Sequence, residues 1–146
     1  MIKQIKHHEK LLAIVIPRKY SADGIKFFTP DSLSQQLAYM NHPAGYKISP
    51  HLHNEVPRQV VFTNEALFIR SGKVRVDFYD EHRKYLESLV LHQGDVILLI
   101  GGGHGFEMLE PTEMIEVKQG PYAGALDKTV FEGVESSALR IRTADE

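Results

Sequence analysis

Apolar and polar residues alternate along much of the chain, and the alternation is most regular between Lys73 and Tyr79. Val74, Val76 and Phe78 occupy every second position there. Strand side chains point alternately to two faces, so this pattern predicts a strand with one buried face. Similar short runs follow along the chain, separated by Gly, Pro, Asn and Asp. They predict strands at residues 11–16, 25–29, 36–40, 60–63, 65–71, 73–79, 85–91, 96–100, 106–110, 114–119 and 128–131.

This succession of strands predicts an all-β fold in which residues 1–146 form a single domain. N-terminal strands fall within residues 1–40, and a C-terminal strand and tail occupy residues 127–146. Val96–Ile100 is apolar at every position, which indicates that both faces of this strand are covered. We expect a partner subunit to supply the second cover, and the chain to form a homodimer.

His51 and His53 suggest a metal site. They are separated by one residue, in the segment that follows Gly45. Residues two apart in an extended strand lie on the same face, so both imidazoles could bind one ion. A hydrogen-bonded pair of core histidines is the alternative for such a spacing.

Two residues further along the chain extend this pattern. Glu65 has the parity of Leu67 and Ile69, so we expect its carboxylate on the core side of the strand, where it needs a partner. His104 follows an apolar strand and three glycines, which permit a turn that directs the imidazole inward. Imidazoles with a carboxylate suit one divalent transition metal ion (Fe, Mn, Ni, Co, Cu or Zn) better than calcium. The predicted ligands are His51, His53, Glu65 and His104.

The order of these residues resembles that of the cupins. The first cupin motif contains glycine, a His-x-His pair, glutamate and glycine, which are matched by Gly45, His51, His53, Glu65 and Gly72. The resemblance covers residues 45–109, which would form the motif-bearing core of the domain. It implies a small antiparallel β-barrel or jelly roll with the site in the barrel mouth.

The match to the cupin motifs has departures. Eleven residues separate His53 from Glu65, more than the three or four usual in the family, so Glu55 or Gln59 is an alternative fourth ligand. The second motif resembles Gly94, Gly102 and His104, but Ile100 stands in place of its proline and the histidine comes one residue early.

Arg58 lies in the same inserted segment and is a candidate for contact with a substrate. A guanidinium at a pocket mouth binds a carboxylate or phosphate bidentately. An exposed or ion-paired loop arginine is the alternative.

The predicted strand at residues 114–119 has two possible orientations. If Ile115 and Val117 point inward, as the usual apolar-in pattern favours, Glu116 and Lys118 are surface charges. In the other orientation, Glu116 and Lys118 enter the barrel as a catalytic acid/base pair or as substrate anchors.

The charge and cysteine content limit the kinds of partner and chemistry that we expect. The chain has 17 Lys and Arg against 19 Asp and Glu, so its charge gives no reason to expect nucleic acid or an anionic membrane as a partner. It has no cysteine, which excludes disulfides, thiolate ligands and cysteine nucleophiles. No apolar run has the length of a signal-peptide core or a membrane span, so we expect a cytoplasmic protein.

These features together predict a metal-dependent enzyme that acts on a small molecule. We favour an isomerase or epimerase of a sugar or sugar nucleotide, in which the metal stabilises an enediolate and a side chain moves the proton. Arg58, Glu116 and Lys118 would suit such an anionic substrate. A metal-dependent dioxygenase and a non-catalytic binding or sensor protein are the alternatives, because one fold hosts unrelated activities.

Overall fold

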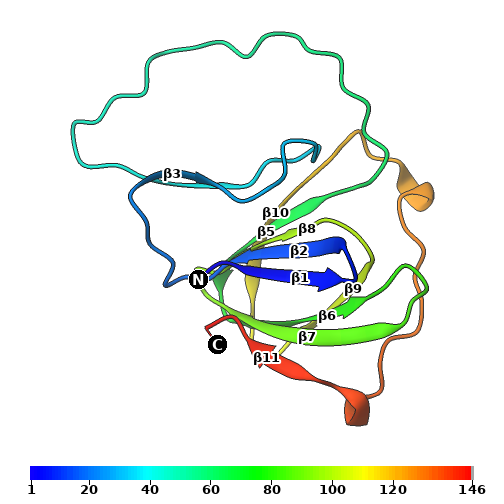
Figure 1. Cartoon of the computed structure of the whole chain (residues 1–146). Coiled ribbons are helices and arrows are strands. Elements are labelled where there is room, and N and C mark those ends of the chain that lie inside the picture. The colour runs from blue at the N-terminus through cyan, green and yellow to red at the C-terminus, as the bar shows by residue number, and fades with distance from the viewer. Residues whose placement is uncertain (146) are drawn as a thin grey trace. The chain divides into compact units, whose positions relative to one another are not determined.

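The protein is described here by a computed structural model that covers residues 1–145 (Figure 1). Strands dominate it, and the predicted all-β class is confirmed. The strands are β1 Lys3–His7, β2 Lys10–Ile16, β3 Gly24–Phe27, β4 Ala38–Asn41, β5 Glu65–Ser71, β6 Lys73–Tyr79, β7 Tyr85–His92, β8 Val96–Leu99, β9 Gly103–Met108, β10 Glu113–Lys118 and β11 Ile141–Thr143. Two short 3-10 helices are η1 Gly124–Leu126 and η2 Ser136–Ala138. Among residues 1–145, no helix has the length and apolar character to cross a membrane.

The chain divides into two compact units. Unit 1 comprises Met1–Tyr20 and the chain from Phe62 onward, and unit 2 is Ser21–Val61. Unit 2 contains the antiparallel hairpin of β3 and β4, whose ends are joined by a hydrogen bond from Thr29 Oγ1 to Gln36 Oε1 of 2.7 Å. All residues of the hydrophobic core cluster in the described chain lie in unit 1.

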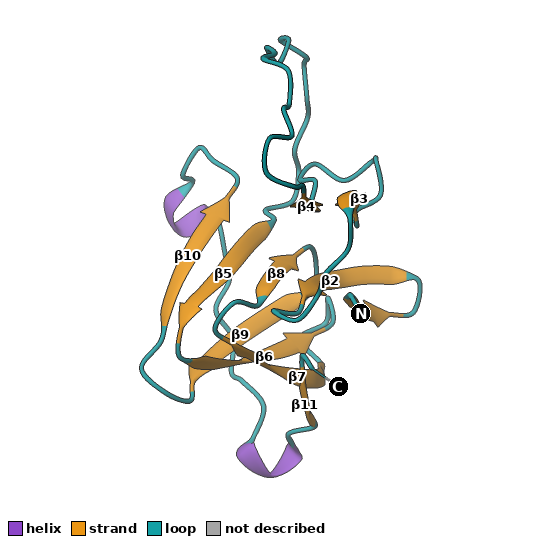
Figure 2. Cartoon of the chain, turned by 90° about the vertical axis from the view of Figure 1, so that its left-hand side faces the viewer, coloured by secondary structure: helices purple, strands orange, loops and turns teal. Residues whose placement is uncertain are grey.

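Unit 1 contains two sheets, which Figure 2 shows with their strands in orange. The order in the larger sheet is β1-β2-β8-β5-β10, and the order in the smaller one is β11-β7-β6-β9. The strands of residues 1–145 pair within these separate sheets and do not close into one continuous barrel. The expectation of purely antiparallel pairing is wrong at one place, because β11 runs parallel to β7. A long connection of the kind between β7 and β11 is what parallel neighbours require.

Both sheets of unit 1 contribute side chains to one core. Leu67 and Ile69 of β5 pack there with Val76 and Phe78 of β6, and all four are at most 5% exposed. Burial of such side chains stabilises the fold by about 1.5–3 kcal/mol each. The expected burial of both faces of β8 is confirmed, because consecutive residues Ile97, Leu98 and Leu99 are all buried. Cover by a partner subunit stays a prediction.

Glycine is required at two turns of unit 1. Gly72 joins β5 to β6 with a φ of 85°, and a Cβ there would lie 2.2 Å from the carbonyl oxygen of Pro111. Gly102 precedes β9 with a φ of 68°, and a Cβ would lie 2.4 Å from the carbonyl oxygen of Tyr79. L-residues disfavour this backbone region, and here the space is also closed. The predicted tight turn before His104 is therefore confirmed.

Several predicted strands differ from those of the structure. Residues 60–63 and 128–131 form no strand, and His51 and His53 also lie outside any strand, whereas β1 and β11 were not predicted. In the second of these segments, Phe131 packs edge-on against the ring of Tyr79, with centroids 5.0 Å apart. Its apolar side chain is therefore anchored without backbone pairing.

Candidate functional site

Glu65, Glu116 and Lys118 gather on the core-facing side of the larger sheet, at the edge formed by β5 and β10. Lys118 pairs with Glu65 across the strands, and Glu116 pairs with Leu67. Directly opposed residues of antiparallel strands share a face, and Leu67 belongs to the core. Glu65, with the same parity, therefore lies on the core side as predicted.

The favoured orientation of residues 114–119 is wrong, because Ile115 and Val117 do not point inward, and the catalytic or anchoring role of Glu116 and Lys118 stays a prediction. Glu116 and Lys118 share the face of the buried Leu67, whereas Ile115 and Val117 are 52% and 51% exposed on the other face. Met114 packs against the core from the inward face of β10. The inward face of β10 is therefore apolar at Met114 and polar at Glu116 and Lys118.

His104 joins this group from β9 in the smaller sheet. It is paired with the buried Phe78, so its imidazole shares the core-facing side. Its Nε2 lies 3.1 Å from Glu65 Oε2, which makes a contact between the two sheets. Phe106 and Met108 occupy the next positions on the same face of β9, and they are 37% and 47% exposed. The predicted inward position of His104 is therefore confirmed, with apolar surface beside it.

Ion pairs and hydrogen bonds connect four polar residues of the two sheets, which are Glu65, His104, Glu116 and Lys118. Lys118 Nζ lies 4.0 Å from Glu65 Oε1 and 3.7 Å from Glu116 Oε1. The hydrogen bond with His104 is the main cause of a lowered pKa for Glu65, and the charges of His104 and Lys118 act in the same direction while burial opposes them. Glu65 is therefore held as a carboxylate. We call Glu65, His104, Glu116 and Lys118 the inter-sheet cluster.

Asn64 is a residue of this site that the sequence analysis missed. It is 2% exposed, its side-chain amide donates to the carbonyl oxygen of Ile100 at 2.9 Å, and its backbone N–H donates to Gln119 Oε1 at 2.6 Å. These bonds tie the start of β5 to the ends of β8 and β10, beside Glu65. An asparagine next to a predicted strand is the only signal in the sequence, and asparagine is equally common in turns.

The Glu65 and His104 pair fits two ligands of a transition metal ion. Bonds of about 2.1 Å at right angles on a six-coordinate ion separate neighbouring ligand atoms by about 3.0 Å. The observed separation of Glu65 Oε2 and His104 Nε2 is 3.1 Å. The same distance is that of their hydrogen bond, so two ligands of one ion could replace it without a large movement.

His51 and His53 form a second pair, within unit 2. Their rings are 5.3 Å apart between centroids in an edge-on arrangement, and His51 Nδ1 lies 2.9 Å from the carbonyl oxygen of Ser49. Glu55, Arg58 and Gln59 are exposed in the same unit. Within residues 1–145, no three histidine or acidic side chains are close enough together to hold a metal ion. The shared four-ligand site, with its alternatives Glu55 and Gln59, and the substrate contact of Arg58 stay predictions.

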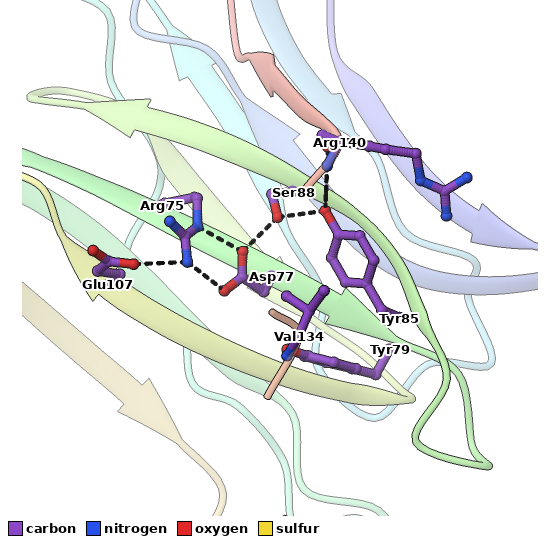
Figure 3. Close-up of polar contacts among 8 residues, drawn as sticks. All are labelled: Arg75, Asp77, Tyr79, Tyr85, Ser88, Glu107, Val134 and Arg140. Atoms are coloured by element: carbon purple, nitrogen blue, oxygen red, sulfur yellow. Dashed lines mark hydrogen bonds and ion pairs between the residues drawn. The ribbon is translucent and has the colours of Figure 1, made fainter. Parts of the chain in front are cut away.

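A different polar network lies on the other face of the smaller sheet (Figure 3). The Asp77 carboxylate accepts hydrogen bonds from Arg75 Nε at 2.8 Å, from Arg75 Nη2 at 3.0 Å and from the Ser88 hydroxyl. Arg75 also contacts Glu107 at 2.7 Å. The hydrogen bond with Asp77 is the main cause of a raised pKa for Arg75. We call Arg75, Asp77 and Ser88 the Asp77 network.

Tyr85 connects the Asp77 network to the C-terminal part of the chain. Its hydroxyl lies 2.8 Å from Ser88 Oγ and accepts a hydrogen bond of 2.8 Å from the backbone N–H of Arg140. The backbone N–H of Ser88 donates to the carbonyl oxygen of Arg140 at 2.8 Å. The residue before β11 is therefore held in place by its backbone.

Comparisons of this chain with protein-family models, with curated proteins and with solved structures found no match.

Proposed function

We propose that the protein is an enzyme that moves a proton on a small, oxygenated, anionic molecule, as an isomerase or epimerase of sugars or sugar nucleotides does. One observation supports this proposal above others. Glu65, a carboxylate with a lowered pKa, touches His104 and Lys118 on a core-facing surface that is still partly open to solvent. An ionisable group with a shifted pKa that lies against other charged groups in this way is typical of acid–base sites.

Each residue of the inter-sheet cluster would have a distinct task. Glu116 would accept the proton, because its carboxylate lies beside Lys118 and outside the pair that would hold the metal ion. Lys118 would attract the anionic group of the substrate and stabilise negative charge as it forms on the substrate oxygen. Glu116 would then return the proton at the neighbouring atom. Phe106 and Met108 would exclude water from one side of the bound molecule.

A divalent transition metal ion and the cupin jelly roll belong to this proposal. Two facing sheets around one core are consistent with a jelly roll, and the order of the glycine, histidine and glutamate residues resembles the cupin motifs. Glu65 and His104 would hold the ion. A bound ion supplies Lewis acidity toward a substrate oxygen.

Solvent-proton exchange tests the proposed reaction. We expect the purified, metal-loaded protein to incorporate deuterium from heavy water into carbon positions of at least one member of a panel of sugar phosphates and nucleotide sugars, read by proton NMR. Glu116→Gln should lower the rate by about 10²–10⁴-fold, the usual contribution of a general base.

Glu110→Gln is the matched control, because Glu110 is an exposed acidic residue outside the inter-sheet cluster. It should leave the exchange rate unchanged. Iron in the purified protein together with substrate-dependent oxygen consumption would replace the isomerase with the dioxygenase. Tight binding of a panel member without exchange or oxygen consumption would favour a binding protein.

A further inference from the structure

An open cleft lies between the N-terminal strand and the C-terminal strand of unit 1, away from the residues of the inter-sheet cluster. Its volume is about 550 Å³, within the range of small-molecule sites. Lys6 of β1, Glu87 of β7, Arg140 and Arg142 line it, together with apolar Ile5 and Leu86. Three cationic side chains therefore surround this space with one carboxylate.

The cations of this cleft are only partly neutralised. Arg142 is paired with Glu87. Arg140 lies over the ring of Tyr85, with 5.7 Å between its guanidinium carbon and the ring centroid. Neither Lys6 nor Arg140 has a carboxylate partner within the described residues 1–145. An anion that enters the cleft thus finds positive charge that no carboxylate of residues 1–145 neutralises at Lys6 and Arg140.

Hydrogen bonds hold the backbone of Arg140 in place. It is bonded to Tyr85 and Ser88, and Figure 3 shows the Arg140 side chain directed away from Asp77. Arg140 precedes β11, Arg142 lies within it, and both side chains line the cleft. Two guanidinium groups at one cleft can bind a tetrahedral or planar anion through several charged hydrogen bonds.

We propose that this cleft binds the phosphate group of a small soluble molecule. A phosphate monoester carries close to two negative charges at neutral pH and offers three acceptor oxygens, which matches three cations opposed by one carboxylate. A carboxylate ligand would leave more of this positive charge unbalanced. Glu87 competes with the ligand for Arg142.

Calorimetric titration of the whole protein with glycerol 3-phosphate tests this site, with glycerol as the uncharged comparison. We expect binding that strengthens between pH 5.5 and pH 7.5, as the second phosphate proton is lost near pH 6. Arg140→Gln should weaken binding by about tenfold or more, the effect of losing a charged hydrogen bond. Lys128→Gln, an exposed lysine outside the cleft, should leave binding unchanged.

Glu87→Gln gives the sharper result, because it should tighten binding by releasing Arg142. A variant that merely unfolds could not produce this gain. Equal binding by wild type and Arg140→Gln would overturn the site. Binding to vesicles that contain phosphatidic acid, without binding of glycerol 3-phosphate, would overturn the assignment to a soluble ligand.

Discussion

The inter-sheet cluster and the Asp77 network are built from the same kinds of groups but differ in burial. Arg75 and Asp77 have side chains only 12% and 10% exposed, and the carboxylate of Asp77 receives three hydrogen bonds. In the inter-sheet cluster the exposed side-chain fractions rise from 18% at Glu65 to 43% at Glu116, and Lys118 contacts its partners at 3.7–4.0 Å. The closed network has little bonding capacity left for a ligand, whereas the open one retains it.

This difference shows why a charged pair alone does not identify a catalytic site. A buried pair is costly to break, because the remaining charge loses its partner in a medium that solvates it poorly. A partly exposed pair contributes less to folding and can exchange partners with a substrate. We therefore expect substitutions in the Asp77 network to affect mainly stability, and substitutions in the inter-sheet cluster to affect mainly chemistry.

The largest effect on stability should come from Asp77→Ala. It leaves Arg75 and Ser88 without their shared acceptor, which should lower the free energy of unfolding by about 3–5 kcal/mol. Urea denaturation measures this. Glu107→Gln is the control, because Glu107 has a side chain 58% exposed and its loss should cost less than about 1 kcal/mol. Equal losses in the two variants would break the distinction between the networks.

Asn64→Ala should have the next largest effect. Its buried amide holds Ile100, so its loss should lower the free energy of unfolding by about 1–3 kcal/mol. The same variant should also reduce proton-exchange activity, since Asn64 adjoins Glu65. Asn54→Ala, at an exposed position of unit 2, is the comparison and should change neither property. Full activity in Asn64→Ala would show that the strand ends do not position Glu65.

A smaller effect is expected from Tyr85→Phe. This change removes the hydroxyl between Ser88 and the backbone of Arg140 and keeps the ring. It should lower the free energy of unfolding by about 0.5–1.5 kcal/mol in the same urea assay. Because the Arg140 backbone is then less restrained, binding of glycerol 3-phosphate should weaken as well. Tyr122→Phe, at an 85% exposed position, is the matched control.

The smallest effect on stability at neutral pH should come from Glu65→Gln, less than about 1 kcal/mol for a partly exposed pair. The pKa of Glu65 is lower in the folded state than in the unfolded state, where it is near 4.3. Its stabilising contribution is therefore present above that value and is lost as pH falls through the folded pKa. Wild type and variant should differ by a constant amount above about pH 6, and the difference should shrink as the pH falls below about 4.3 and through the folded pKa. A difference independent of pH would contradict this coupling.

Much of the larger architecture could be predicted from the sequence. Strand β6 was predicted with its observed bounds, because the spacing of Val74, Val76 and Phe78 at every second position indicates one buried face. Strand β1 was missed because its segment KQIKH has a single apolar residue, Ile5, so no period can be measured. Parallel pairing of β11 with β7 depends on distant chain segments and leaves no local pattern.

The site was less predictable than the fold. Parity alone placed Glu65 on the core side, and the glycines before His104 indicated its turn inward. The orientation of Glu116 and Lys118 was predicted wrongly, because the usual apolar-in pattern favoured Ile115 and Val117, and only the register with β5 shows the reverse. Sequence proximity likewise gave no sign that Asn64 would bond to Ile100, which lies 36 residues away.

The hydrogen bonds of Asn64 also affect local unfolding at the ends of β5, β8 and β10. Since one residue fastens the ends of three strands, none of these ends can fray without loosening the other two. Opening there should be a single cooperative event that exposes several backbone amides at one rate.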